Sequence, residues 1–133
     1  MRKILIFISF FLSITCCYSQ TAEEYLNSGV EKFNLQDYRG AIEDLNKAIE
    51  INPLFVDAYG KRGAAKTILK DYRGALSDYT KAIEINPQDA LAYYTRGLLK
   101  LKLDQKDSAC LDLSKADELG YYKAYELIKR FCN

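Results

Sequence analysis

The chain has 133 residues, of which 49% are hydrophobic and 28% charged, a composition typical of a folded globular protein. It contains no histidine, which excludes His-based catalytic triads, His general bases and the common His-containing zinc sites. The formal net charge is +1, so no overall field favours binding to nucleic acid or to an anionic membrane.

The first nineteen residues have the pattern of an export signal. Arg2 and Lys3 precede an apolar run over residues 4–14, and small or polar residues follow that run. The run is too short to span a bilayer comfortably. We therefore predict a signal peptide over residues 1–19.

Processing of this signal can follow two routes. Cleavage after Ser19 is expected, which would make the mature protein periplasmic or secreted, with no membrane span. Attachment of a lipid at Cys16 or Cys17 is the alternative. Either route would place the chain in a compartment where disulfides persist.

A sequence motif occurs twice, with starts thirty-four residues apart. Residues 37–53 read DYRGAIEDLNKAIEINP and residues 71–87 read DYRGALSDYTKAIEINP. Aligning residues 22–53, 56–87 and 90–119 adds a third, looser copy. The positions that then coincide are Tyr25, Tyr59 and Tyr93; Gly29, Gly63 and Gly97; Ala41, Ala75 and Ala109; and Ala48, Ala82 and Ala116. Self-similarity at this period indicates a stacked solenoid.

Each repeat is expected to form two helices. In the first repeat these cover residues 22–36 and 39–52, and Pro53 cannot continue the second helix. We expect Gly29 to face Ala41 and Leu45 across the pair, because a missing side chain lets the helix backbones approach closely.

This pattern resembles the tetratricopeptide repeat (TPR). The first two copies contain three features of this repeat: the Tyr-x-x-x-Gly spacing in the first helix, an Ala, a large apolar residue and a second Ala in the second helix, and the terminal Pro. The third copy has Tyr121 in place of Pro. The resemblance implies an all-α fold, a right-handed superhelix (α-solenoid) of three helix-turn-helix repeats. We place the repeats at residues 22–55, 56–89 and 90–121, followed by a C-terminal capping helix within residues 122–133.

Two cysteines lie outside the export signal. Cys110 lies ten residues before the turn at Gly120 and Cys132 lies twelve after it, so they reach nearly the same height in an antiparallel helix pair. We predict a disulfide that clamps the capping helix to the third repeat. Two buried free thiols are the alternative.

Charged residues also recur at the repeat period. The second helices carry Asp44, Asp78 and Asp112, and the first helices and the capping helix carry Arg62, Arg96 and Arg130. We predict a structural ladder of ion pairs from each Asp to the Arg of the next repeat, because pairing within a repeat would leave Asp44 and Arg130 without partners. Lys32, Lys66 and Lys100 are expected near the same carboxylates. An anion or metal site is the alternative.

The resemblance implies a protein-binding adaptor whose first helices line a concave groove. The residues expected on the groove are Leu26, Val30 and Phe33; Gly60, Lys61, Ala64, Thr67 and Ile68; and Tyr94, Leu98 and Leu101. Family members that grip a C-terminal carboxylate carry Lys, Asn and Arg on inner positions, where this chain has Leu26, Val30, Leu91 and Thr95. We therefore expect an apolar strand or amphipathic helix as the ligand, anchored by Phe33 and Tyr94.

No catalytic function is expected. The sequence has no strand pattern and no Gly-rich phosphate loop, and its acidic residues fall on helix surfaces at the repeat period. We expect no cofactor and no nucleic-acid partner. The alternative to an adaptor is a structural or accessory envelope protein that self-associates as a homo-oligomer without a dedicated peptide ligand.

Overall fold

The structure is a computed structural model that describes residues 20–133, so the predicted export signal lies outside the described residues. The described part forms seven α-helices and no strand. The helices are α2 (Ala22–Asn34), α3 (Tyr38–Ile51), α4 (Val56–Ile68), α5 (Tyr72–Ile85), α6 (Ala90–Lys102), α7 (Lys106–Glu118) and α8 (Lys123–Phe131).

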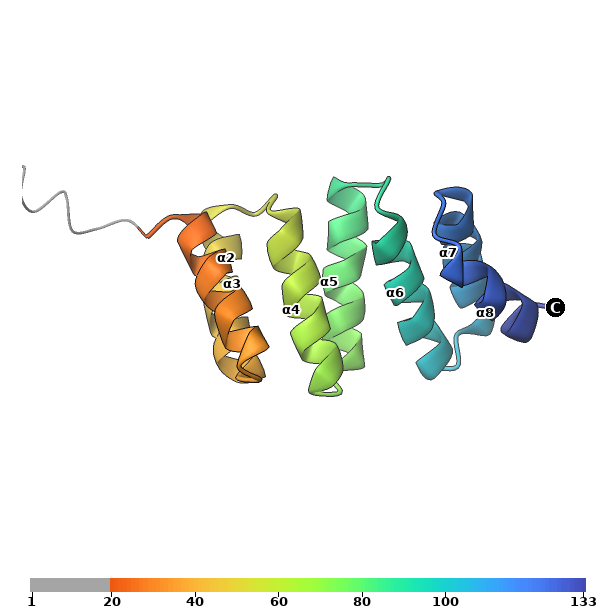
Figure 1. The fold of residues 1–133 in the computed structure, drawn as a ribbon, viewed down its shortest axis with the longest axis horizontal. Coiled ribbons are helices and arrows are strands. Elements are labelled where there is room, and N and C mark those ends of the chain that lie inside the picture. The colour runs from red at the N-terminus through yellow and green to blue at the C-terminus, as the bar shows by residue number, and fades with distance from the viewer. Residues whose placement is uncertain (1–19) are drawn as a thin grey trace, which may run out of the picture.

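The helices form three hairpins in a row, with α8 closing the C-terminal end (Figure 1). Within a hairpin, α2 packs on α3, α4 on α5 and α6 on α7, and each second helix also packs on the first helix of the next hairpin. This arrangement confirms the expected all-α solenoid. The predicted helices of the first repeat end within two residues of the observed ones.

The repeated Asp-Tyr-Arg-Gly motif forms the start of the second helices. Asp37 caps α3 and Asp71 caps α5, each accepting a hydrogen bond of 3.0 Å from the backbone N–H of the glycine three residues later. A Cβ at Gly40 or Gly74 would collide with the capping carboxylate. The glycine of the motif therefore leaves room for the cap.

Small residues also set the spacing inside each hairpin. A Cβ at Gly29 would lie 2.9 Å from Leu45 Cγ, and one at Gly97 would lie 3.0 Å from Leu113 Cγ. Both leucines are fully buried. The close approach of the two helices expected from the sequence is confirmed.

The ion pairs form within the repeats, so the predicted direction of the ladder is wrong. Arg62 binds Asp78 and Arg96 binds Asp112, each through two hydrogen bonds of 2.6–3.0 Å between helices of one hairpin. In the first repeat Asp44 instead accepts hydrogen bonds from Ser28 and Lys32, both at 2.7 Å.

The predicted pairing was wrong because it assumed that each of the three Asp residues pairs with an Arg and each of the three Arg residues with an Asp. Ser28 and Lys32 satisfy Asp44 without an arginine, and the exposed guanidinium of Arg130 lies over the ring of Phe131. The expected lysine contacts are confirmed: Lys32, Lys66 and Lys100 lie 2.7, 3.0 and 2.8 Å from Asp44, Asp78 and Asp112.

Each paired arginine also links two neighbouring repeats. The remaining N–H of Arg62 donates to Asn46 Oδ1 at 2.8 Å, and that of Arg96 donates to Thr80 Oγ1 at 3.3 Å. Asn46 and Thr80 belong to the preceding repeat. The contact between repeats is therefore a hydrogen bond from a guanidinium to an uncharged acceptor, in place of the predicted ion pair.

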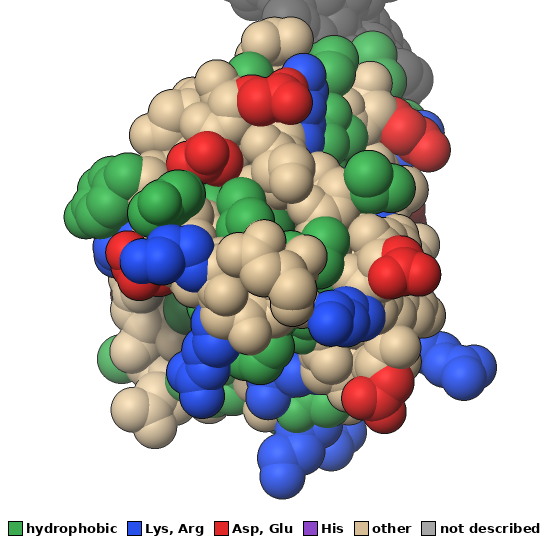
Figure 2. All heavy atoms as spheres, turned by 90° about the vertical axis from the view of Figure 1, so that its right-hand side faces the viewer, with side chains coloured by type: hydrophobic (Ala, Val, Ile, Leu, Met, Phe, Trp, Pro, Cys, Tyr) green, Lys and Arg blue, Asp and Glu red, His purple; other side chains and the backbone are tan. Residues whose placement is uncertain are grey.

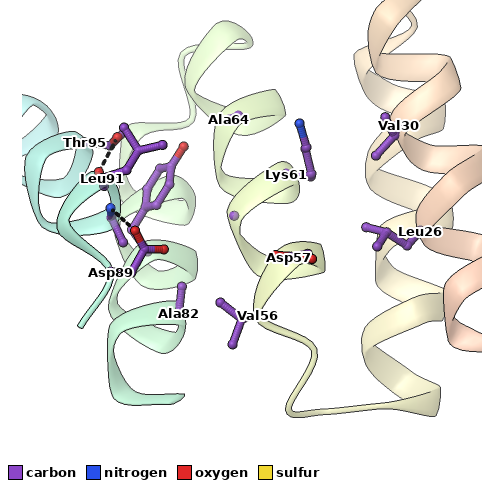
Figure 3. Close-up of a pocket in the computed structure, with 13 residues that line it drawn as sticks. Leu26, Val30, Val56, Asp57, Lys61, Ala64, Ala82, Asp89, Leu91 and Thr95 are labelled. Atoms are coloured by element: carbon purple, nitrogen blue, oxygen red, sulfur yellow. Dashed lines mark hydrogen bonds between the residues drawn. The ribbon is translucent and has the colours of Figure 1, made fainter. Parts of the chain in front are cut away.

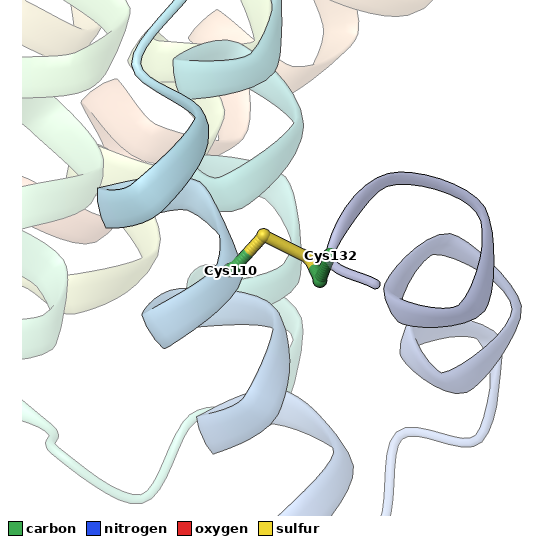
Figure 4. Close-up of a disulfide and its surroundings, with 2 residues drawn as sticks. All are labelled: Cys110 and Cys132. Atoms are coloured by element: carbon green, nitrogen blue, oxygen red, sulfur yellow. A yellow bond between two sulfur atoms is a disulfide. The ribbon is translucent and has the colours of Figure 1, made fainter.

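The C-terminal helix is held by a cysteine pair at disulfide distance, as predicted. Cys110 of α7 and Cys132, directly after α8, have Cα atoms 5.7 Å apart and sulfur atoms 2.04 Å apart (Figure 4). Ala124 of α8 is fully buried against Leu113 and Ala116 of the third repeat. On the outer end of the array, charged side chains lie among hydrophobic ones (Figure 2). This helix thus ends the array, as expected for a cap.

Candidate functional site: a groove along the first helices

A groove of about 360 Å³ crosses the first helices of the three repeats (Figure 3). Leu26 and Val30 of α2 form one side, α4 runs through the middle, and Leu91 and Thr95 of α6 lie on the other side. The remaining lining residues are Val56, Asp57, Gly60, Lys61 and Ala64 near or on α4, Tyr79 and Ala82 on α5, and Asp89 and Ala92 at the start of α6.

Five of the residues expected on the groove line it: Leu26, Val30, Gly60, Lys61 and Ala64. Three others, Thr67, Leu98 and Leu101, line a second, neighbouring pocket, which also has Thr95 in its wall. Because Thr95 lines both hollows, the two are adjacent along α6.

The two aromatic residues expected to anchor a ligand line neither hollow. The ring of Phe33 packs edge-on against Tyr38, with centroids 5.2 Å apart, and the ring of Tyr94 lies 4.6 Å from that of Tyr121. Both side chains are half-buried within the protein itself. Ile68, also expected on the groove, is exposed but lines neither hollow.

The second pocket depends on the capping helix. Its volume is about 380 Å³, and α6 supplies five of its seven lining residues, namely Thr95, Leu98, Leu99, Leu101 and Lys102. Phe131 of α8 completes the wall, next to the cysteine that joins α7. The sequence analysis did not place Phe131 on a binding surface, because that position depends on the angle at which α8 crosses the last repeat.

The floor of the groove contains a glycine that the packing of the helices does not require. A Cβ at Gly60 would meet no atom within 4 Å, whereas one at Gly63, in the same helix, would lie 3.0 Å from the ring of Tyr79. A glycine inside a helix costs about 1 kcal/mol relative to alanine. At Gly60 the helix bears that cost without a packing gain, and the result is an open hollow in the groove.

Tyr79 lines the groove, although nothing in the sequence indicated that position. It occupies the position of Leu45 and Leu113 in the other repeats, and its ring lies against Gly63. Burial raises the pKa of Tyr79 to about 12. Its hydroxyl makes no hydrogen bond to the described residues. Because no side-chain polar atom in these residues is both fully buried and without a hydrogen-bond partner, the Tyr79 hydroxyl must be accessible to solvent.

Three charged residues lie on the groove, namely Asp57, Asp89 and Lys61. Asp89 caps α6 through a hydrogen bond of 3.1 Å from Ala92 N–H, and Asp57 lies in the first turn of α4. In Figure 3 the amine of Lys61 points away from Asp57. The two aspartates were not expected on the groove, because they precede the helical positions that the repeat pattern places there.

Neither a metal site nor a membrane span occurs in the part of the chain that the structure describes. Residues 20–133 contain no group of three or more Cys, Asp or Glu residues placed to hold a metal ion. None of their helices combines the length and the apolar character needed to cross a bilayer.

Comparison with protein families identifies the repeats directly. Three models described as tetratricopeptide repeat match residues 22–53, 56–89 and 78–110. A search of curated proteins finds no significant match. The chain belongs to the tetratricopeptide-repeat family.

Solved structures with the same fold include several TPR proteins. The crystal structure of MamA is 31% identical, with a TM-score of 0.74 over 79% of this chain, and this chain covers 61% of the MamA chain. The first TPR of Spaghetti, bound to the HSP90 peptide SRMEEVD, is 25% identical, with a TM-score of 0.80 over 86% of this chain and 93% of that one. The TPR2B domain of yeast Sti1, in complex with pHsp70, is 28% identical, with a TM-score of 0.70 over 82% and 99% of the two chains.

Proposed function

We propose that this protein is a non-catalytic interaction module that binds a segment of another protein in the groove along its first helices. The observation that carries the proposal is the open space above Gly60, lined by apolar side chains of α2, α4 and α6. A hollow of this kind can take one large apolar side chain of a partner, as binding hot spots commonly do.

Two of the structural neighbours support a peptide as the ligand. The first TPR of Spaghetti and the TPR2B domain of Sti1 were both solved with chaperone-derived partners. Their likeness to this chain extends over more than four fifths of its length. We infer that this chain also binds a peptide, with a different ligand chemistry.

The ligand we propose is an apolar segment, either an extended strand or an amphipathic helix. Leu26, Val30 and Leu91 give the groove apolar walls, and Lys61 is the one cationic residue among those that line it. A single lysine does not form the multi-donor clamp that a C-terminal carboxylate requires. We now assign the apolar anchoring to these walls and to the second pocket, in place of Phe33 and Tyr94.

We also propose that the protein is exported. The pattern of residues 1–19 and the cysteine pair at disulfide distance support this location. Mass spectrometry of the mature protein from the producing cell tests it. A chain that begins at Gln20 is expected; a lipid on Cys16 or Cys17 would identify the lipoprotein route, and an intact Met1 would contradict export.

The binding proposal can be tested with one substitution that fills the groove. Gly60→Leu places a side chain in open space on a helix, so the fold should be retained or slightly stabilised. A matched control is Ser77→Leu, at an exposed position of α5 that is not among the groove-lining residues.

Each of the three proteins is immobilised and exposed to the exported fraction of the producing cell, and captured proteins are quantified by mass spectrometry. We expect at least one partner that the wild type and Ser77→Leu capture in equal amounts. The amount captured by Gly60→Leu should be lower by at least about tenfold, which corresponds to about 1.4 kcal/mol of binding free energy. Equal capture by all three proteins, or recovery of this chain alone, would favour the self-associating alternative.

A further inference from the structure

The charges on the groove indicate the chemistry of the segment that fills it, provided that the groove is the binding site proposed above. Two carboxylates, Asp57 and Asp89, and one amine, Lys61, line it. The two aspartates lie at the N-terminal ends of neighbouring first helices, so both belong to the same end of the groove.

Both carboxylates have capacity for a ligand. Asp57 is exposed and makes no ion pair with any residue in the described range, and the Lys61 amine one turn later points away from it. Asp89 uses Oδ1 to accept the capping N–H of Ala92, which leaves Oδ2 without a hydrogen bond from residues 20–133. Carboxylates beside apolar walls favour a cation more strongly than carboxylates on an open surface, because less water screens them.

The apolar part of the groove adjoins this acidic end. Val56 precedes Asp57, Gly60 follows it by one turn of α4, and Leu91 lies two residues after Asp89. One ligand segment can therefore place an apolar side chain above Gly60 and a cationic side chain at the end of the groove that carries the two aspartates. An acidic side chain at the same place would face two like charges.

We propose that the groove selects a segment in which a large apolar residue is accompanied by a nearby Lys or Arg. The apolar side chain fills the space above Gly60, and the cation binds at Asp57 and Asp89. The hydroxyl of Tyr79, which stays protonated and reaches solvent at the floor, can donate to a backbone carbonyl of the same segment. This ligand has the opposite charge to an acidic C-terminal peptide.

The probe is a phage-displayed library of random twelve-residue peptides, selected on the oxidised protein. Peptides that also bind Gly60→Leu are removed, so that the remaining pool depends on the groove. We expect Lys and Arg to be at least about threefold enriched over Asp and Glu among the groove-dependent peptides, relative to the unselected library.

Two isosteric variants then test the contacts with a synthetic peptide from the selected pool. Asp57→Asn removes a charge from an exposed position, and Asp89→Asn removes a charge while keeping a residue that caps helices as well as Asp does. Each should weaken binding by about threefold to tenfold, less at high salt, because exposed charge pairs are screened. Glu50→Gln, an exposed carboxylate of α3 outside the groove, should bind as the wild type does.

The outcomes separate the two proposals. Groove-dependent peptides that are acidic or show no charge preference would leave the binding module standing and overturn the basic ligand. Wild-type affinity of both Asn variants would overturn the basic ligand as well. A pool with no peptide that loses binding to Gly60→Leu would overturn both.

Discussion

Arg62 and Asp78 face each other across one helical hairpin, sixteen residues apart, and are joined by two hydrogen bonds of 3.0 and 2.6 Å. Lys66 adds a third contact to the same carboxylate at 3.0 Å. The Asp78 side chain is only 2% exposed, so these partners take the place of water around its carboxylate. The pair therefore fixes how α4 lies on α5, and through Asn46 how the second repeat lies on the first.

Removal of the Asp78 carboxylate should destabilise the protein strongly. Asp78→Ala leaves Arg62 and Lys66 partly buried without their counter-charge, and breaking such a pair costs about 3 kcal/mol or more. Glu50→Ala, at an exposed position, is the control and should change stability by less than about 0.5 kcal/mol. Urea unfolding followed by circular dichroism measures both; equal midpoints would refute the structural role of the pair.

Two glycines of one helix should respond to alanine in opposite directions. Gly60→Ala is expected to stabilise the protein by up to about 1 kcal/mol, because alanine favours the helix and the new Cβ meets no atom within 4 Å. Gly63→Ala should be destabilising, since its Cβ would lie 3.0 Å from the Tyr79 ring and separate α4 from α5. Thermal melts of the two variants give the sign, and shifts in the same direction would contradict the packing described here.

Asp44 should contribute to stability at neutral pH and cease to do so in acid. Burial alone would raise the pKa of its carboxyl, but the hydrogen bonds from Lys32 and Ser28 outweigh burial and hold the pKa below its usual value of 3.8. A lowered folded-state pKa gives stability that is fully present above the unfolded-state pKa and is lost as the pH falls through the folded-state value.

The matching experiment compares wild type with Asp44→Asn, which cannot titrate. At pH 7 the variant should be less stable by about 1.5–3 kcal/mol, the size expected for hydrogen bonds to a charged group. The gap should narrow as the pH falls below about 4, near the reference pKa of a free Asp. Urea midpoints between pH 7 and pH 2.5 test this; a constant gap would show that Asp44 is not the titrating group.

Reduction of the cysteine pair should loosen the capping helix without unfolding the first repeat. Cys110 and Cys132 are 22 residues apart, and closing a loop of that size stabilises by about 3 kcal/mol in the chain-entropy model. After reduction, or in Cys132→Ser, amide hydrogen exchange in α8 should accelerate more than exchange in α3. Unchanged protection of α8 after confirmed reduction would show that its packing alone holds it.

The architecture could be predicted from the sequence, because residues one repeat period apart occupy equivalent positions in the fold. Gly29 and Leu45 are followed thirty-four residues later by Gly63 and Tyr79, so the packing of one hairpin predicts that of the next. The cysteine pair followed from helix rise and a single turn. Each of these inferences depended on separations within one pair of consecutive helices, which the 1.5 Å rise of a helix determines.

The groove and the direction of the ion pairs were harder to predict, because both depend on which side chains meet between helices and not only on the spacing of residues along the chain. Phe33 and Tyr94 have the helical spacing of groove residues but are covered by aromatic neighbours, Tyr38 and Tyr121. The expected partner of Asp44 was an arginine of the next repeat, since sequence spacing did not show that Ser28 could satisfy it. Neither outcome follows from periodicity alone.

The central claim is that the space above Gly60 is where a partner binds, and chemical-shift mapping tests it most directly. Isotope-labelled protein is titrated with a groove-selected peptide, and backbone amide shifts are followed by NMR. The account predicts that the largest changes lie on the groove faces of α2, α4 and α6, with little change on the exposed faces of α3 and α7, and that Gly60→Leu abolishes them. Saturable shifts confined to α3, α5 and α7, unaffected by Gly60→Leu, would contradict it.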